Sequence, residues 1–513
     1  MDHFVLQVLF MAVVALATFV LLYVKRRRSR TESRPESTLP SPPKLPIIGH
    51  IHLLTGMPHH AFGQLARKLG PIIYLQLGQV PTLVISSAQL ARLVLRNHDQ
   101  VFGTRPRDLV AAKYLSFGCT DITFSPSGPY WRQARKICAA ELLSQKRVNS
   151  FELVRDEEVN RLVSTVLTRS GSEVDMRELL FTLSNNTVCR VAFGKPLIDD
   201  SERKNHELMD MLTETQALLA GFFMGDLFPK WDWVNSVSGL KRRLKNNMDD
   251  LSRVVDEIVK EHVKKRETSK KDFVDVLLCK QKEDDDLEVP ITDDGIKAIL
   301  TDIFVAGTDT TSATLEWTMT ELVRHPRVMK KAQNEVRKIA GSGGKVNQSH
   351  LQHLHYLRSV LKETMRLHPV VPLVGPREST ENCILNGYEI PAKTRVLINA
   401  YAIGRDAESW ENPLEYNPER FEDTRIDFRD QDFRFLPFGG GLRSCPGYFF
   451  GLASMEIALA RLLYHFDWAL PHGVGANDVN LEEIFGRATR KKSALILLPT
   501  ANKDYAFKMV ETE

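Results

Sequence analysis

Residues 438–447, FGGGLRSCPG, decide the fold of this chain, because they place Cys445 in a glycine-rich loop behind Phe438 and Arg443. A buried cysteine remains a thiolate only where its surroundings exclude water and favour the anion. The glycines let the backbone fold closely enough to direct N–H groups at sulfur, and Phe438 can shield it. The apolar run 448–463 predicts a helix that starts at the cysteine, with its positive N-terminal end toward the sulfur.

Cys445 also has a simpler interpretation as a structural cysteine in a turn, the usual role of a lone free cysteine. The stretch nevertheless resembles the cytochrome P450 signature F-x-x-G-x-R-x-C-x-G at every fixed position. That resemblance implies that Cys445 is the axial thiolate ligand of the iron of haem b. It also implies that Phe438 and Gly447 belong to the haem site and that Arg443 binds a haem propionate.

Composition and charge narrow the class of protein further. The chain has 513 residues, 43% hydrophobic and 26% charged, which is ordinary for a globular enzyme. Length alone suggests about three domains, but the motifs around one haem are scattered from Trp131 to Cys445, so we expect one catalytic domain. A net charge of +4 without basic and aromatic interleaving argues against nucleic-acid binding. Six cysteines without a C-x-x-C pair argue against zinc or disulfide frameworks and indicate a reducing compartment.

The N-terminus predicts a membrane anchor. Residues 4–24 carry no charge, reach about 31 Å as a helix, and are followed at once by the basic run KRRRSR. The alternative, a cleaved secretory signal, fits less well because the basic flank follows the apolar run. We therefore expect an anchor at 1–24, a basic and proline-rich linker at 25–49 and a monooxygenase domain at 50–513. The positive-inside rule then predicts a single-pass protein with a cytosolic catalytic domain. The resemblance, which is to plant microsomal members of the family, implies that the membrane is that of the endoplasmic reticulum.

The coarse pattern predicts a mainly α fold with a minor β portion. Short β-like runs at 72–77 and 82–85 precede long helical stretches, including 249–265 and 359–367, and 280–286 reads as a charged turn. The resemblance specifies this class as the cytochrome P450 fold with an N-terminal transmembrane helix.

Residues 296–322 predict a long buried helix with an unusual centre, AGTDTT at 306–311. Small and hydroxylated residues there predict local loosening, although hydroxyls bonding back to the helix would explain them as well. The stretch resembles the oxygen-activating helix of the family. The resemblance implies two catalytic residues, Thr310 at the oxygen-binding side of the haem and Asp309 on the path that delivers protons.

Two further sets of charged residues resemble family motifs. Glu363 and Arg366 lie three apart on one helical face and, with Arg420, match a buried structural network that has no part in the chemistry. Trp131 and Arg135 match W-x-x-x-R, where both residues reach a haem propionate.

Arg377 occupies another position that usually contacts a propionate. The resemblance also implies electrons from NADPH, delivered by a separate NADPH-cytochrome P450 reductase, together with O2 and a small-molecule substrate. Arg132 and Lys136 could form a positive face for the acidic reductase, or simply a solvated helix face.

The predicted substrate is a small, largely apolar plant metabolite. The segments that line the pocket in this family are apolar and aromatic here: Leu115, Phe117, Ile122, Phe124, Leu218, Phe222, Phe223, Phe304, Val305, Val371, Leu373 and Phe485. Several stretches are similar to family members that 5-hydroxylate tryptamine to serotonin: 54–60, 116–121, 287–290 and 488–492.

An indole amine carries a positive charge, so a carboxylate is expected in the pocket, and Asp121 and Asp302 are candidates. Asp302 is equally interpretable as a helix-packing acid. The alternatives are hydroxylation of a terpenoid, a phenolic or another alkaloid, or a non-oxygenating conversion of an aldoxime or peroxide. A haem-thiolate sensor or electron carrier needs no proton delivery, so the presence of both Asp309 and Thr310 argues against that class of protein.

Overall fold

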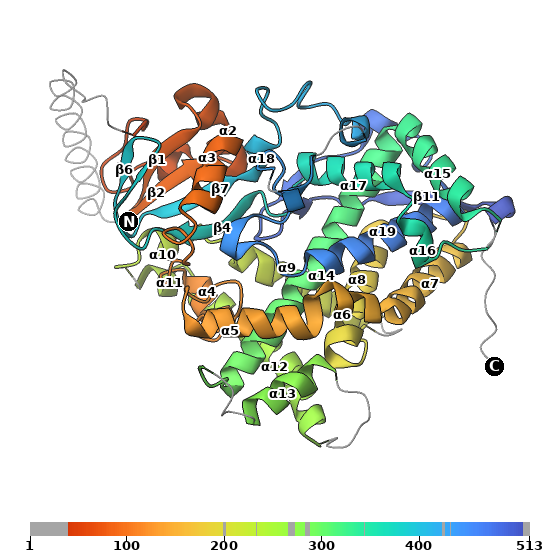
Figure 1. The fold of residues 1–513 in the computed structure, drawn as a ribbon, viewed down its shortest axis with the longest axis horizontal. Coiled ribbons are helices and arrows are strands. Elements are labelled where there is room, and N and C mark those ends of the chain that lie inside the picture. The colour runs from red at the N-terminus through yellow and green to blue at the C-terminus, as the bar shows by residue number, and fades with distance from the viewer. Residues whose placement is uncertain are drawn as a thin grey trace, which may run out of the picture.

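Helices dominate the structure, and the largest sheet lies toward one end of it (Figure 1). The computed structural model describes residues 39–198, 202–231, 233–264, 272–282, 288–342, 344–422, 426–430 and 432–505. The mainly helical class with minor sheet is confirmed. The predicted anchor at 1–24 and the first part of the linker lie outside the described residues, and no helix among the described residues is long and apolar enough to span a bilayer.

The helices follow one another along most of the chain. Their bounds are α2 Pro58–Leu69, α3 Ala88–Arg92, α4 Val110–Leu115, α5 Pro129–Cys138, α6 Gln145–Ser150, α7 Glu152–Thr168, α8 Met176–Phe193, α9 Glu202–Leu218, α10 Met224–Leu227, α11 Trp233–Val237, α12 Leu240–Lys264, α13 Phe273–Lys282, α14 Asp293–Arg324, α15 Pro326–Ala340, α16 Gln348–Leu351, α17 His355–Leu367, α18 Ala400–Ile403 and α19 Tyr448–His465.

The strands form small sheets. Their bounds are β1 Ile72–Leu77, β2 Val80–Ile85, β3 Val174–Asp175, β4 Leu373–Glu378, β5 Cys383–Leu385, β6 Tyr388–Ile390, β7 Arg395–Asn399, β8 Phe466–Ala469, β9 Glu483–Ile484, β10 Arg490–Lys491 and β11 Ile496–Ala501. The largest sheet has the order β1-β2-β7-β4. The pair β2 and β7 is parallel, with Leu83 opposite Val396, and the other pairs in this sheet are antiparallel.

The linker predicted at 25–49 meets the sheet where it is described. His50 Nδ1 accepts from the backbone N–H of Gln76, and the N–H of Tyr74 donates to the carbonyl of Pro40. Residues from about 40 onward therefore lie along β1.

Helix α14 runs through the centre of the molecule and packs against α8, α17 and α19 (Figure 1). Thr292 caps its N-terminus by accepting from the N–H of Gly295, which satisfies one of the free donors there. Gly307 lets α8 come close, since a Cβ there would lie 2.8 Å from a methyl group of Val188. The helix is continuous, so the predicted loosening at 306–311 is wrong: the hydroxyls bond back to the helix, as Thr310 Oγ1 does to the carbonyl of Ala306.

Most predicted elements agree with the observed ones. The strand at 72–77 is β1, and the helices predicted at 249–265, 359–367 and 448–463 are parts of α12, α17 and α19. The charged turn predicted at 280–286 begins too early, because residues 280–282 form the last turn of α13, and the rest of it, 283–286, lies outside the described residues. Charged side chains do not end a helix whose other face packs against α8 and α12.

A buried ionic network ties α17 to the segment before α19, as predicted. Arg366 donates to both oxygens of Glu363, at 2.6 and 2.7 Å, and Arg420 Nε donates to the same carboxylate at 3.0 Å. The side chains of Glu363 and Arg366 have no exposed surface. Arg366 also donates to the carbonyls of Gly404 and Pro413, so α17 is joined to a long stretch of irregular chain.

Replacing Glu363 by Ala should strongly destabilise the fold. The substitution leaves Arg366 and Arg420 without their shared carboxylate, and removing one partner of a buried pair costs about 3–5 kcal/mol. The urea midpoint, followed by circular dichroism, should fall well below that of the unaltered protein. Asp250→Ala is the control, because it removes an exposed partner of Arg253 and should change stability by less than about 1 kcal/mol. Equal midpoints for the two variants would contradict the network's role.

Candidate active site

A cavity of about 290 Å³ lies beside α14, at the centre of the fold. Ala306 and Thr310 contribute the α14 wall, and Cys445 contributes from the loop before α19. Other walls come from the loop that holds Ile122 and from residues 369–371, directly after α17. Most of the surface is apolar, and the cavity therefore suits a largely hydrophobic guest.

The loop that carries Cys445 needs its glycines. Gly439 and Gly441 have φ of 67° and 66°, in the left-handed region that other residues rarely adopt. A Cβ on Gly441 would also lie 2.4 Å from the carboxylate of Asp99 and from the carbonyl of Leu95. The N–H of Cys445 donates to the carbonyl of Phe438 at 2.9 Å, which closes the loop on itself.

The surroundings of the Cys445 sulfur act in opposite directions. Burial raises the pKa of the thiol, whereas the backbone N–H of Gly447 and the positive charge of Arg135 lower it. Gly447 is also the N-cap of α19, whose N-terminus thus lies beside the sulfur. Of the six cysteines, Cys445 is the one that contributes to the cavity wall within the described chain.

Guanidinium groups gather at one rim of this cavity. Arg135 donates to the carbonyl of Ser444 at 2.6 Å. Arg443 donates to the carbonyls of Gly103 and Ser125 and stacks on the ring of Trp131 at 3.8 Å. Neutral carbonyls satisfy these donors without cancelling their charge, so the rim remains positive.

Arg105 is a third guanidinium at this rim, and it was missed in the sequence because it belongs to no motif. It donates to the carbonyls of Thr123 and Pro376, each at 2.8 Å. Burial and the neighbouring charge of Arg443 lower its pKa. A thiol on an apolar wall with a positively charged rim is the donor set that fits a flat apolar cofactor with anionic groups at its edge, such as haem.

Three of the predicted site residues lie behind the cavity wall rather than in it. Trp131 Nε1 donates to the carbonyl of Ile122, and the ring supports Arg443. Arg377 is almost fully buried and donates to Asp99 at 2.8 Å and to the carbonyl of Gly440 at 2.7 Å. Asp309 is the third, whereas Arg135, Phe438, Arg443, Cys445, Gly447 and Thr310 all line the cavity.

Asp309 points away from the cavity toward Arg490. Arg490 Nη1 lies 3.4 Å from one carboxylate oxygen and donates through Nη2 to Thr213 at 2.7 Å. Gln216, which lines the cavity, is the other polar side chain that acts on this carboxyl. Burial raises the pKa of this carboxyl, and Arg490 lowers it. Asp309 is thus a buried acid one residue from Thr310, on a different face of α14.

The predicted substrate lining is correct in part. Ile122, Phe124, Val305 and Val371 line the main cavity, and Phe222, Leu373 and Phe485 line a smaller neighbouring cavity of about 40 Å³. The others line neither cavity: Leu115, Phe117, Leu218, Phe223 and Phe304. Phe304 is two positions from Ala306 and therefore faces the other side of α14, where its ring packs 6.2 Å from that of Phe193.

The two acids proposed for the pocket differ in place. Asp121 is buried and accepts from the N–H groups of Phe124 and Ser125, outside the cavity wall. Asp302 lines the cavity and accepts from the N–H groups of Ile122 and Thr123 and from the hydroxyl of Thr123. Burial raises the pKa of both carboxyls. Asp302 therefore holds the loop against α14 while one face of it borders the cavity.

The Cytochrome P450 family profile matches residues 39–497, which include the whole cavity wall. The chain is a cytochrome P450. Its cofactor is accordingly haem with a thiolate-ligated iron, and it is a monooxygenase that uses a small-molecule substrate, O2 and a redox partner. In this family, electrons typically come from NADPH through a reductase.

Relatives of this P450 have diverse substrates. The chain is 51% identical to tryptamine 5-hydroxylase of Oryza sativa subsp. japonica, over 96% of this chain and 95% of that protein. It is 44% identical to strychnine-11-hydroxylase of Strychnos nux-vomica, over 94% and 95%. Among solved structures, a zebra fish cytochrome P450 with abiraterone has a TM-score of 0.74 and 26% identity, over 87% of this chain and 99% of that one.

Proposed function

We propose that this P450 hydroxylates tryptamine at carbon 5 to give serotonin, with one oxygen atom of O2 entering the product. The observation that carries the proposal is a single apolar cavity lined by a thiol, a hydroxyl and a carboxylate, those of Cys445, Thr310 and Asp302. The 51% identity to tryptamine 5-hydroxylase supports the choice of substrate.

In this proposal Cys445 is the iron ligand, and the residues around it hold the haem. Phe438 and Gly447 line the cavity beside the cysteine loop, and Arg135 and Arg443 would bind propionate oxygens from the rim. Trp131 and Arg377 lie behind the cavity wall and support it. The ring of Trp131 supports the guanidinium of Arg443, and Arg377 holds the cysteine loop by donating to the carbonyl of Gly440. When bound, haem supplies the redox centre at which O2 is reduced.

Protons are delivered from the α14 side. Asp309 is buried beside Arg490, so a proton on its carboxyl can be exchanged without charge entering the apolar cavity. The hydroxyl of Thr310 lines the cavity and bonds back to the carbonyl of Ala306, and a small rotation would free it to donate a hydrogen bond into the cavity. The two residues together hold and transfer protons where bulk water is excluded.

Substrate orientation depends on Asp302. The ammonium group of tryptamine would lie at the cavity face of this carboxylate, with the indole ring against Phe124 and Val305. Terpenoid, phenolic or other alkaloid substrates, and non-oxygenating conversions of an aldoxime or peroxide, are the alternative outcomes of a substrate screen.

The full protein would be held at the endoplasmic reticulum membrane. We propose residues 1–24 as a single-pass anchor, 25–49 as the linker and 50–513 as the cytosolic domain. Arg132 and Lys136 are exposed on α5 and would meet an acidic NADPH-cytochrome P450 reductase.

Replacing Cys445 by Ser should abolish the thiolate signature. A hydroxyl replaces the soft sulfur ligand, so the reduced carbon monoxide complex should lose its long-wavelength Soret band. The absorption spectrum of that complex is the measurement, and Cys383→Ser is the control, since Cys383 lies on β5 away from the cavity. A normal band in Cys445→Ser would exclude Cys445 as the ligand.

Replacing Thr310 by Ala should uncouple electron use from product formation. NADPH oxidation should continue while product per NADPH falls and hydrogen peroxide appears, because proton delivery in the cavity is impaired. Thr318→Ala is a matched control: its hydroxyl bonds back to Thr314 on the same helix but does not reach the cavity. Equal coupling ratios in the two variants would contradict the role of Thr310.

The tryptamine proposal is tested with the full chain and a plant reductase. Serotonin should form, and tryptamine should give a type I spectral shift that weakens about tenfold or more in Asp302→Asn, because a charge-assisted contact is lost. 3-Ethylindole, which lacks the amine, should bind both forms alike. If neither serotonin nor the type I spectral shift were observed, tryptamine would be excluded as a substrate. A panel of terpenoids, phenolics and alkaloids would then identify the substrate.

A further inference from the structure

Arg487 lies between the two cavities and belongs to the walls of both. It follows β9 in the loop that leads to β10, and it borders Phe485 and Leu219 at the junction. No recognised motif includes it. Its position is on the route between the smaller cavity and the main one.

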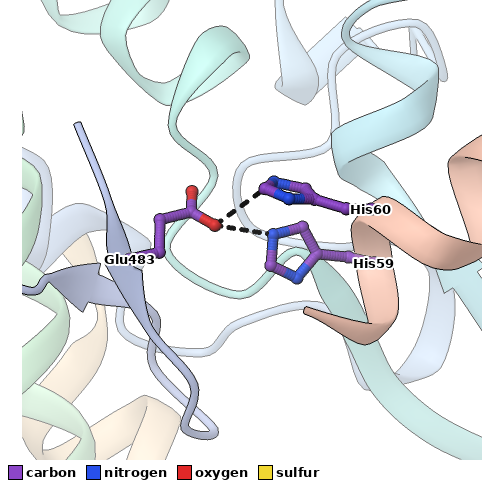
Figure 2. A group of neighbouring side chains, drawn as sticks. All are labelled: His59, His60 and Glu483. Carbon is purple, nitrogen blue, oxygen red and sulfur yellow. Dashed lines mark hydrogen bonds and ion pairs between the residues drawn. The ribbon is translucent and has the colours of Figure 1, made fainter. Parts of the chain in front are cut away.

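The backbone that carries Arg487 is firmly held. Glu483 begins β9 and binds the N-terminus of α2: His59 Nε2 lies 2.8 Å, and His60 Nε2 3.3 Å, from one carboxylate oxygen (Figure 2). Farther along the loop, the N–H of Arg487 donates to the carbonyl of Gln216 at 2.8 Å, and the next N–H donates to the Gln216 side chain at 3.0 Å. The backbone therefore fixes the position from which the side chain of Arg487 lines the two cavities.

The guanidinium of Arg487 makes no hydrogen bond or ion pair with any residue that the structure describes. It lies 5.4 Å from the centre of the Phe124 ring, and the negative charges of Asp302 and Asp121 attract it from a longer distance. The carboxylates of Asp121 and Asp302 are not within ion-pair distance, and they accept hydrogen bonds from their own loop. A guanidinium held inside a protein without an acceptor is costly, so this one is expected to meet an anion.

The guanidiniums of Arg487 and Arg105 meet beside Gly375. A Cβ at this position would lie 2.6 Å from Arg487 Nη2 and 2.8 Å from Arg105 Nη2, so the two guanidiniums already fill the place that a side chain would need. Two like charges this close repel each other unless an anion lies between or beside them. A planar carboxylate matches the planar donors of a guanidinium.

We infer that Arg487 binds the carboxylate of small aromatic acids, and that such acids form a second class of ligand for this P450. The haem propionates are the other source of carboxylate. The substrate is favoured because Arg487 also borders the smaller cavity, which Cys445 and Arg443 do not reach. The inference goes beyond tryptamine hydroxylation and holds whether or not tryptamine is a substrate.

The test uses the purified holoenzyme, indole-3-propionate and the primary amide of that acid. Spectral titration should show that Arg487→Met weakens binding of the acid by about tenfold to a hundredfold, because a charge-assisted bidentate contact is lost. Binding of the amide should stay within about twofold. Arg487→Lys should restore part of the affinity, and Arg242→Met, at an exposed position on α12, should bind both ligands normally.

Haem content per protein, from the pyridine haemochrome spectrum, is measured for every variant. Haem loss in Arg487→Met with retained secondary structure would assign Arg487 to a propionate and overturn the inference. Unchanged acid binding in that variant would overturn it too. A protein that binds the acid through Arg487 but neither binds nor oxidises tryptamine would refute the proposed function and leave this inference intact.

Discussion

Positive charge buried at the rim of one internal cavity is the constraint on which the rest of the structure depends. Arg105, Arg135 and Arg443 line that rim, and Arg377 lies directly behind it. Backbone carbonyls orient the first three guanidiniums but leave their charge in place, whereas Arg377 pairs with Asp99. Burying such charge without anions is unfavourable. This rim suits a cofactor with an anionic edge, and haem binding should therefore contribute directly to the stability of the fold.

The same rim connects distant parts of the chain. Arg443 donates to the carbonyls of Gly103 and Ser125. Arg377 joins β4 to the loop of Cys445 by donating to the carbonyl of Gly440. Neighbouring segments thus hold the cysteine loop from several sides, and its glycines let the backbone follow this path. The Glu363 network plays a comparable part at the far end of α17, where it positions the residues that enter the cavity after Leu367.

Helix α14 separates two kinds of chemistry. Its cavity side presents Asp302, Ala306 and Thr310, one turn apart, while Asp309 faces Arg490 and the apolar residue Phe304 packs into the core. A continuous helix can do this because side chains one turn apart share a face and those two residues apart do not. The loop after β9 completes the cavity from the C-terminal part of the chain, tied to α2 by Glu483 (Figure 2).

Local patterns in the sequence determined most of the helices and strands, the loop of Cys445, the hydroxyl-rich centre of α14 and the pairing of Glu363 with Arg366. These features depend on neighbours within a few residues, where glycine, helical spacing and charge act directly. Only the tertiary structure decided that Phe304 belongs to the core, that Trp131 and Arg377 lie behind the cavity wall, and that Arg105 and Arg487 approach one another at Gly375. Residues hundreds of positions apart meet through packing, and no local pattern indicates which guanidinium will lack a hydrogen-bond acceptor among the described residues.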